Sequence, residues 1–132
     1  MLLRIELLDL ARTRMRDAEL LYQKGRYDGA AYLSGYAVEF ALKARICKQL
    51  RWADFPSKDN EFKGKEIFKV HDFDRLLEYT GIAPKIRAYC TPEWSIMKVW
   101  SPDYRYKPVG SANQQDVQEM IASAKILMKK IR

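Results

Sequence analysis

The single histidine, His71, is the residue of this 132-residue chain best suited to acid–base chemistry. Imidazole changes its charge near neutral pH, so it serves proteins as a general base, a general acid or a phosphate ligand. Two interpretations are compatible with the sequence. The ring stabilises the start of a helix predicted after Asp72, or it lines a site together with Lys69 or Arg75.

Glu39 is the second candidate, because its carboxylate interrupts an otherwise apolar stretch of the chain. Lys43 follows one helical turn later, at the Glu-then-Lys spacing that favours an ion pair. A carboxylate in apolar surroundings has to be paired or hydrated. Glu39 and Lys43 therefore form either an ordinary ion pair within one helix or a pair that opens onto a cleft and orients a polar ligand.

The segment 104–107 interleaves aromatic and cationic side chains, in the order Tyr104, Arg105, Tyr106 and Lys107. Aromatic rings can stack on nucleic-acid bases while Arg and Lys contact phosphates, so this spacing suits a single-stranded nucleic acid. The alternative is that Trp100 and one tyrosine pack beneath the protein while the charged side chains point outward.

Established catalytic and metal-binding motifs are missing from the sequence. It contains neither a G-x-x-x-x-G-K-[ST] loop nor a G-x-G-x-x-G loop. One histidine and two cysteines are too few for a histidine-pair metal site, a zinc cluster or a disulfide framework. We therefore predict no metal and no cofactor. Cys47 or Cys90 can act as a nucleophile with His71 only through a tertiary contact, and a buried cysteine is the simpler interpretation.

Composition excludes several classes of protein. Hydrophobic residues make up 48% of the chain and aromatic residues 12%, which excludes intrinsic disorder. No apolar run is long enough to span a membrane, and the opening MLLRIELLDLARTR is too charged for a signal peptide. We expect a cytoplasmic protein. The net charge of +7 suits a phosphate-bearing partner.

Hydrophobic periodicity predicts two long helices in the first 55 residues. The first ends at Gly25 and the second begins near Asp28, which is placed as an N-cap. The apolar stripe of the first helix consists of Leu8, Ala11, Met15, Ala18 and Tyr22, and that of the second consists of Ala30, Leu33, Ala37, Phe40, Ala44 and Cys47. The second helix is apolar almost all round, which predicts a central position and a homodimer.

Local signals divide the rest of the chain. Residues 51–70 mix charges, Pro and Gly and are expected to be mostly irregular, and Asp72 and Gly81 bound a short helix. Residues 82–100 hold one or two short helices, 101–111 form a loop, and a last helix begins after Asn113. We find no strand pattern. The sequence thus predicts an all-α, up-and-down bundle of four to five helices in a single domain, residues 1–132.

Charge is uneven along the predicted helices. Residues 26–51 carry five basic and two acidic side chains, and residues 113–132 carry four and two. If these two helices adjoin, their basic ends form one patch.

Four segments, in order, resemble the HEPN family of helical domains. They are the hairpin AELLYQKGRYDGAAY, the core YAVEFALKARI of the second helix, the segment HDFDRLLEYTG, and the YRYKP loop before a closing helix with repeated Ala. Together these segments extend over most of residues 8–130. The resemblance implies a helical bundle, a homodimer and a role in RNA or nucleotide metabolism, including partnership with a nucleotidyltransferase in toxin–antitoxin or defence-like systems.

The resemblance does not extend to the ribonuclease motif of the family, R-x(4–6)-H. The positions that this motif assigns to arginine before His71 hold Gly64, Lys65 and Glu66, and no histidine follows Arg105. We therefore expect a non-catalytic module that binds RNA or a nucleotide or masks a protein partner. The alternative is a divergent, metal-independent ribonuclease or toxin that uses His71 with Lys65, Lys69 or Arg105.

Overall fold

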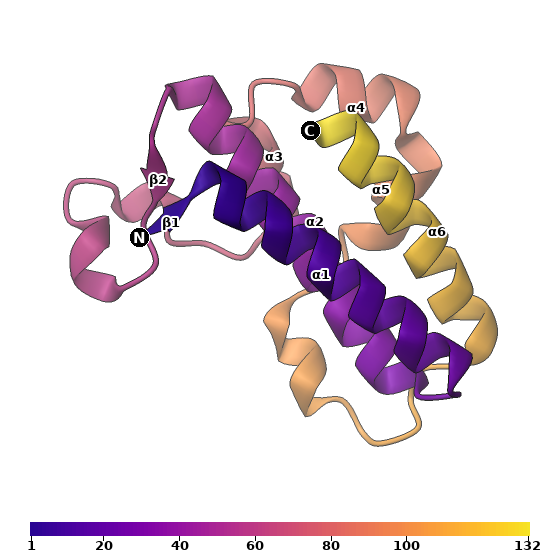
Figure 1. Cartoon of the computed structure of the whole chain (residues 1–132). Helices are drawn as coiled ribbons and strands as arrows, with labels where there is room; N and C mark the ends of the chain where they lie inside the picture. The colour runs from indigo at the N-terminus through magenta and orange to yellow at the C-terminus, as the bar shows by residue number, and fades with distance from the viewer.

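Two long antiparallel helices, α1 (Arg4–Gln23) and α2 (Tyr27–Leu50), form the frame of the protein (Figure 1). They are seen in a computed structural model that describes all residues, 1–132. The two helices are joined by a tight turn in which Gly25 adopts φ +74°, a left-handed conformation that glycine tolerates best. The buried residues of α1 are Leu7, Ala11, Met15 and Ala18, which include three of the five predicted stripe residues, while Leu8 and Tyr22 are half-buried.

The other helices cover the rest of α2. Helix α6 (Gln114–Ile131) packs against α2, α5 and α1, and α3 (Phe73–Tyr79) packs on α2 from another side. The short helices α4 (Ala83–Tyr89) and α5 (Thr91–Met97) lie behind α6 in the view of Figure 1. Between α5 and α6, the 3₁₀ helix η3 (Pro102–Tyr106) contacts α2.

Helix α2 is buried on nearly every side within one chain. Its buried positions include Ala30, Ala37, Ala44 and Cys47 of the predicted stripe, and also Val38 and Leu42 outside it. The predicted central position of this helix is therefore confirmed. The sequence-based argument for a homodimer, that the apolar faces of α2 need a second chain to cover them, no longer holds. The homodimer stays a prediction.

The predicted all-α class is confirmed, with three differences in detail. There are six α-helices rather than four to five, because residues 83–97 form two short helices, each with a proline in its first turn. Strands β1 (Leu2–Leu3) and β2 (Asp54–Phe55) pair in antiparallel fashion, and two residues are too few to produce an alternating pattern. Single 3₁₀ turns interrupt the predicted irregular segments, at η1 (Asp59–Phe62), η2 (Glu66–Phe68) and η3.

Two of the three predicted helix caps are confirmed. The Asp72 carboxylate accepts from the backbone N–H of Arg75, and the Asn113 side chain accepts from that of Asp116. The prediction for Asp28 is wrong, since α2 already begins at Tyr27. The Asp28 carboxylate accepts instead from the backbone N–H groups of Gly110 and Ala112, at 2.6 and 3.0 Å. Asp28 therefore makes a contact between distant segments in place of the predicted cap, and this contact holds the chain after η3 against the start of α2.

We expect Asp28→Asn to loosen this tether. The amide offers one oxygen acceptor where the carboxylate offers two, so amide hydrogen exchange at Gly110 and Ala112 should accelerate. The two N–H donors lower the pKa of Asp28. The tether therefore contributes fully to stability above the ordinary carboxyl pKa, and its contribution is lost as the pH falls through the lowered value. Asp17→Asn, at a surface pair with Arg14, is the control and should leave exchange at Gly110 and Ala112 unchanged.

The buried indole of Trp100 anchors the segment before η3 to the middle of α2. Its ring lies directly on the backbone of Gly35, where an added Cβ would overlap the indole. Phe73 stacks on the same ring at 5.4 Å between centroids, and Tyr36 meets it edge-on at 4.9 Å. Because the indole is held by both aromatic rings, it has no room to retreat from a larger residue at position 35.

Gly35→Ala should therefore destabilise the protein by about 1–3 kcal/mol, the usual cost of overpacking. Alanine ordinarily stabilises a helix relative to glycine by up to about 1 kcal/mol, so the sign is reversed here. Gly29→Ala is the matched control, because its closest neighbour is the flexible tip of Leu21, at 3.1 Å. Urea melts of the two variants test the packing, and a Gly35→Ala protein more stable than the parent would contradict it.

Candidate functional site

A buried carboxylate, Glu39, holds the only histidine of the chain. Glu39 lies in the middle of α2 with 1% of its side chain exposed, and its Oε1 is 2.7 Å from Nδ1 of His71. Its Oε2 is 3.4 Å from Nζ of Lys43, one turn further along α2. Both partners are more exposed than the carboxylate, at 59% for His71 and 15% for Lys43. The buried carboxylate thus contacts two basic side chains that lie between it and the solvent.

This contact fixes the direction of the imidazole ring. An ionised carboxylate can only accept hydrogen bonds, so the short contact places a proton on Nδ1 of His71. The other ring nitrogen, Nε2, is then the free one. Nε2 is a proton acceptor when the ring is neutral and a donor when the ring is charged. A carboxylate that orients a histidine in this way is a common arrangement in acid–base and ligand-binding sites.

His71 lies on the wall of a groove of about 510 Å³ between α2, the start of α3 and η3, which we call the η3 groove. Arg105 and Lys98 contribute cations to the same groove, and Asp103 contributes a carboxylate. Tyr36 and Trp100 supply aromatic wall. Burial, the neighbouring Tyr32 hydroxyl and the charge of Glu39 raise the pKa of Tyr36, so its phenol stays protonated and available as a donor.

The segment 104–107 is divided between two environments. Tyr104 packs towards Trp100, with 6.2 Å between ring centroids, and Nζ of Lys107 lies 4.0 Å from the centre of the Tyr104 ring. Tyr104 is therefore the tyrosine of this segment that packs with Trp100, and its ring is not free to stack on a nucleic-acid base. Tyr106 is 72% exposed, and the guanidinium carbon of Arg105 lies 4.7 Å from the centre of its ring. Arg105 and Tyr106 remain accessible to a ligand.

The structure thus brings together four of the six predicted binding residues. Glu39, Lys43 and His71 are in contact, and Arg105 lines the same groove as His71. Tyr106 lies beside Arg105 at the surface, whereas Tyr104 faces a smaller pocket that also includes Asp28. The His71 ring is bonded through Nδ1 to Glu39, and the cap at the start of α3 is Asp72 rather than His71.

Three other cations that the sequence linked to His71 do not enter the η3 groove. Lys69 pairs with Asp59 at 2.8 Å, and Nζ of Lys65 lies over the Trp52 ring at 4.4 Å. Arg75 is exposed on α3. Lys69 and Lys43 line another hollow of about 320 Å³, which His71 also lines.

The two cysteines belong to the core. Cys47 and Cys90 are 1% and 2% exposed, and neither lines a groove beside His71. Burial raises the pKa of the Cys47 thiol to about 11, with a further contribution from Asp54, so the thiol stays protonated and unreactive at neutral pH. No group of three or more His, Cys, Asp or Glu side chains is arranged to hold a metal ion.

Tyr36 was not among the binding residues predicted from the sequence, although a signal for it was present. Tyr36, Glu39 and Lys43 follow one another at intervals of three and four residues, which places them on one face of α2. Lys98 and Asp103 offered no such signal. They line the groove because the packing of Trp100 on Gly35 holds their segment of the chain against α2.

Comparison with known protein families gives one match, in which the HEPN domain corresponds to residues 6–55. The matched residues include nearly all of α1, the whole of α2 and strand β2. Residues 6–55 are thus a match to the HEPN domain family, which confirms the resemblance for this part of the chain. No curated protein and no solved structure matches the chain.

The HEPN match includes Glu39 and Lys43 but ends before His71 and Arg105. The family assignment therefore rests on the α1–α2 hairpin, and the η3 groove is formed partly by residues outside the match. No helix of the structure combines the length and the apolar composition needed to cross a bilayer.

Proposed function

We propose that this chain is a non-catalytic HEPN-type module, extending over residues 1–132, that binds RNA or a nucleotide in the η3 groove. The observation that carries this proposal is the Glu39–His71 contact, which holds an imidazole with a free Nε2 on the wall of a groove that also contains Arg105. Glu39 is buried, so the fold itself keeps this ring in place before any ligand arrives. Such preorganisation lowers the entropic cost of binding.

The mixture of charges in the groove favours a nucleotide unit over a bare phosphate. Arg105 and Lys98 are donors for phosphate oxygens, while Asp103 is an acceptor for hydroxyl or amino groups. The two other carboxylates of the groove are already engaged. Asp72 caps α3, and Asp74 accepts from the indole N–H of Trp94 at 2.9 Å. Ribose hydroxyls, base edges and phosphates together match this set of donors and acceptors.

The HEPN match over residues 6–55 supports a wider role. HEPN domains often pair with nucleotidyltransferases, so we propose that this chain acts with such a partner in a toxin–antitoxin or defence-like system. Its action as a homodimer in the cytoplasm is part of the same proposal and rests on the family.

Arg105→Ala should weaken binding of a fluorescent single-stranded RNA by about tenfold, the usual effect of losing one charge-assisted hydrogen bond. If about three phosphates are contacted, the logarithm of the RNA association constant should fall with log salt at a slope of about −2. Loss of one contact in the variant should make this slope shallower by about 0.7, to about −1.4. Lys63→Ala removes the same charge from an exposed position outside the groove and serves as the control. Equal effects of the two substitutions in fluorescence anisotropy would show that only overall charge matters.

A second candidate function, metal-independent RNA cleavage, is favoured by the same Glu39–His71 contact. Nε2 of a neutral His71 could take the proton of a ribose 2′-hydroxyl, whose oxygen would attack the adjacent phosphorus to form a 2′,3′-cyclic phosphate and displace the 5′-oxygen, which takes a proton from water. Arg105 could stabilise the charge that develops on the phosphate. The tertiary structure places an arginine and a histidine in one groove even though the R-x(4–6)-H pattern is missing from the sequence.

His71→Asn separates binding from cleavage. An asparagine amide can still donate to Glu39 at the place of Nδ1, but it cannot transfer a proton near neutral pH. For a binding module, neither the parent nor this variant should cut RNA in the presence of EDTA, and the variant, which lacks Nε2, should bind RNA more weakly than the parent. Cleavage by the parent that is lost in His71→Asn and absent with 2′-O-methyl RNA would establish the second function instead.

A further inference from the structure

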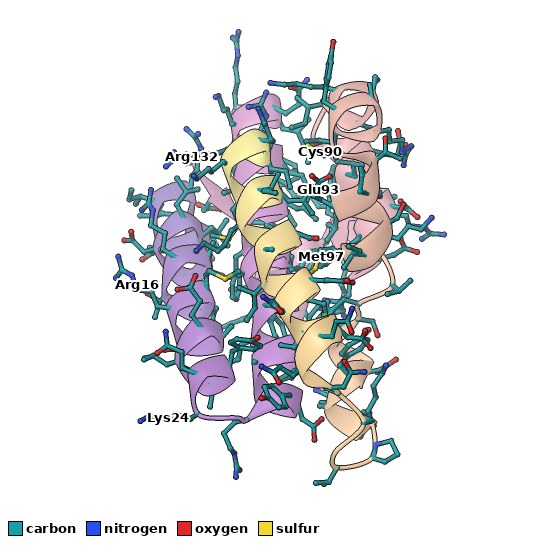
Figure 2. All side chains as sticks on the ribbon, turned by 90° about the vertical axis from the view of Figure 1, so that its right-hand side faces the viewer. Arg16, Lys24, Cys90, Glu93, Met97 and Arg132 are labelled. Atoms are coloured by element: carbon teal, nitrogen blue, oxygen red, sulfur yellow. The ribbon has the colours of Figure 1, made fainter.

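A second groove lies between α1 and α6, where it shares no residue with the η3 groove. This α1–α6 groove has a volume of about 360 Å³. Figure 2 shows the two helices side by side on one face of the protein, with Arg16 on α1 and Arg132 just beyond the end of α6. The floor of the groove is apolar, with half-buried Leu8 and Met128 at its surface and Ala11, Met15 and Ala41 buried beneath them.

The rim of the groove is strongly cationic. It carries Arg12, Arg16, Lys125, Lys129 and Arg132, with Glu19 as the only acid. Glu19 already pairs with Lys125 at 3.1 Å, and Arg12 pairs with Asp9 at 3.2 Å. Arg16 and Lys129 form no ion pair and are both exposed. The rim therefore offers free positive charge on both sides of an apolar floor.

The dimensions of the groove suit a short helical segment. Along α1 the lining extends from Leu8 to Glu19, which at 1.5 Å per residue is about 16 Å, or three helical turns. The half-buried Met128 contributes a flexible thioether side chain, which can adapt to different apolar partners.

We propose that the α1–α6 groove docks an acidic amphipathic helix of a partner protein. Apolar side chains spaced three and four residues apart would lie on the floor, and flanking Glu or Asp side chains would reach Arg16 on one side and Lys129 on the other. An RNA strand fits this groove less well, because no aromatic ring lines it for base stacking. A second copy of this chain fits the groove less well if the two rims face each other, because both rims are cationic and would repel.

A synthetic peptide of about 18 residues, long enough to be partly helical, is a direct probe. It carries Leu and Ala on one face and Glu on both flanks. We expect this peptide to bind the full chain at least about tenfold more tightly than a scrambled peptide of equal composition, or than the same helix with Lys in place of Glu. Binding should weaken as salt is added.

Matched charge reversals locate the site. Lys129→Glu and Lys130→Glu change neighbouring exposed residues in the last turn of α6, so both lose the same interaction with the helix dipole. Only Lys129 lines the groove, whereas the charge of Lys130 acts on Cys90. We expect Lys129→Glu to weaken binding of the acidic peptide by about three- to tenfold and Lys130→Glu to leave it nearly unchanged. Arg16→Glu and Lys24→Glu form the corresponding pair on α1, where Lys24 lies at the far end of the helix (Figure 2).

The protein with both Arg16→Glu and Lys129→Glu provides a rescue test. It should bind the Lys-flanked peptide better than the parent does, an exchange of preference that loss of folding cannot produce. Equal binding of the acidic, scrambled and Lys-flanked peptides would overturn the proposal, as would equal effects of Lys129→Glu and Lys130→Glu. Displacement of the peptide by single-stranded RNA, with an affinity for RNA that depends on Arg16 and Lys129, would assign the groove to nucleic acid instead. Failure of the peptide test leaves RNA binding dependent on Arg105 intact, so the two proposals are tested separately.

Discussion

Because α2 carries apolar side chains around most of its circumference, burying it requires contacts from several elements at once. Its sequence makes this close approach feasible, with Ala30, Ala37 and Ala44 on the inward stripe and Gly35 beneath Trp100. Small residues let neighbouring backbones and rings come near the axis of α2, and the large side chains are contributed mainly by the covering segments. The positions of α1, α3, α6 and η3 all follow from this requirement.

Glu39 is the exception on that buried helix, and its consequences reach the surface. An unpaired carboxylate at this depth would be strongly unfavourable, so its pairing with Lys43 and His71 is needed to stabilise the fold. The approach of His71 brings the start of α3 against α2, on the same side as the indole of Trp100. The elements that define the η3 groove are thus held together by one buried charge and one buried aromatic ring.

The two grooves offer different chemistry, although both lie against the same central helix. The η3 groove mixes cations, a free carboxylate and a fixed imidazole, and it suits a ligand with many donors and acceptors. The α1–α6 groove has an apolar floor and a cationic rim, and it suits an amphipathic segment of opposite charge. Both are consistent with the net charge of +7, which by itself distinguishes neither ligand.

Local spacing in the sequence was sufficient for the helices and for part of the site. The three- and four-residue intervals in α1 and α2, the caps Asp72 and Asn113, and the Glu39–Lys43 pair all depend on residues less than two turns apart, and the structure confirms them. The part of the chain that matches the HEPN domain is also local, because it consists mainly of the α1–α2 hairpin.

Contacts between distant residues were decided only by tertiary structure. His71 lies 32 positions from Glu39, and Asp28 lies more than 80 positions from the amides that it holds. A local pattern cannot distinguish a carboxylate that caps its own helix from one that binds another segment, because both need the same residue type. The choice follows from which donors the packing around α2 brings within hydrogen-bonding distance. For the same reason the α1–α6 groove, whose two walls come from opposite ends of the chain, could not be foreseen from either helix alone.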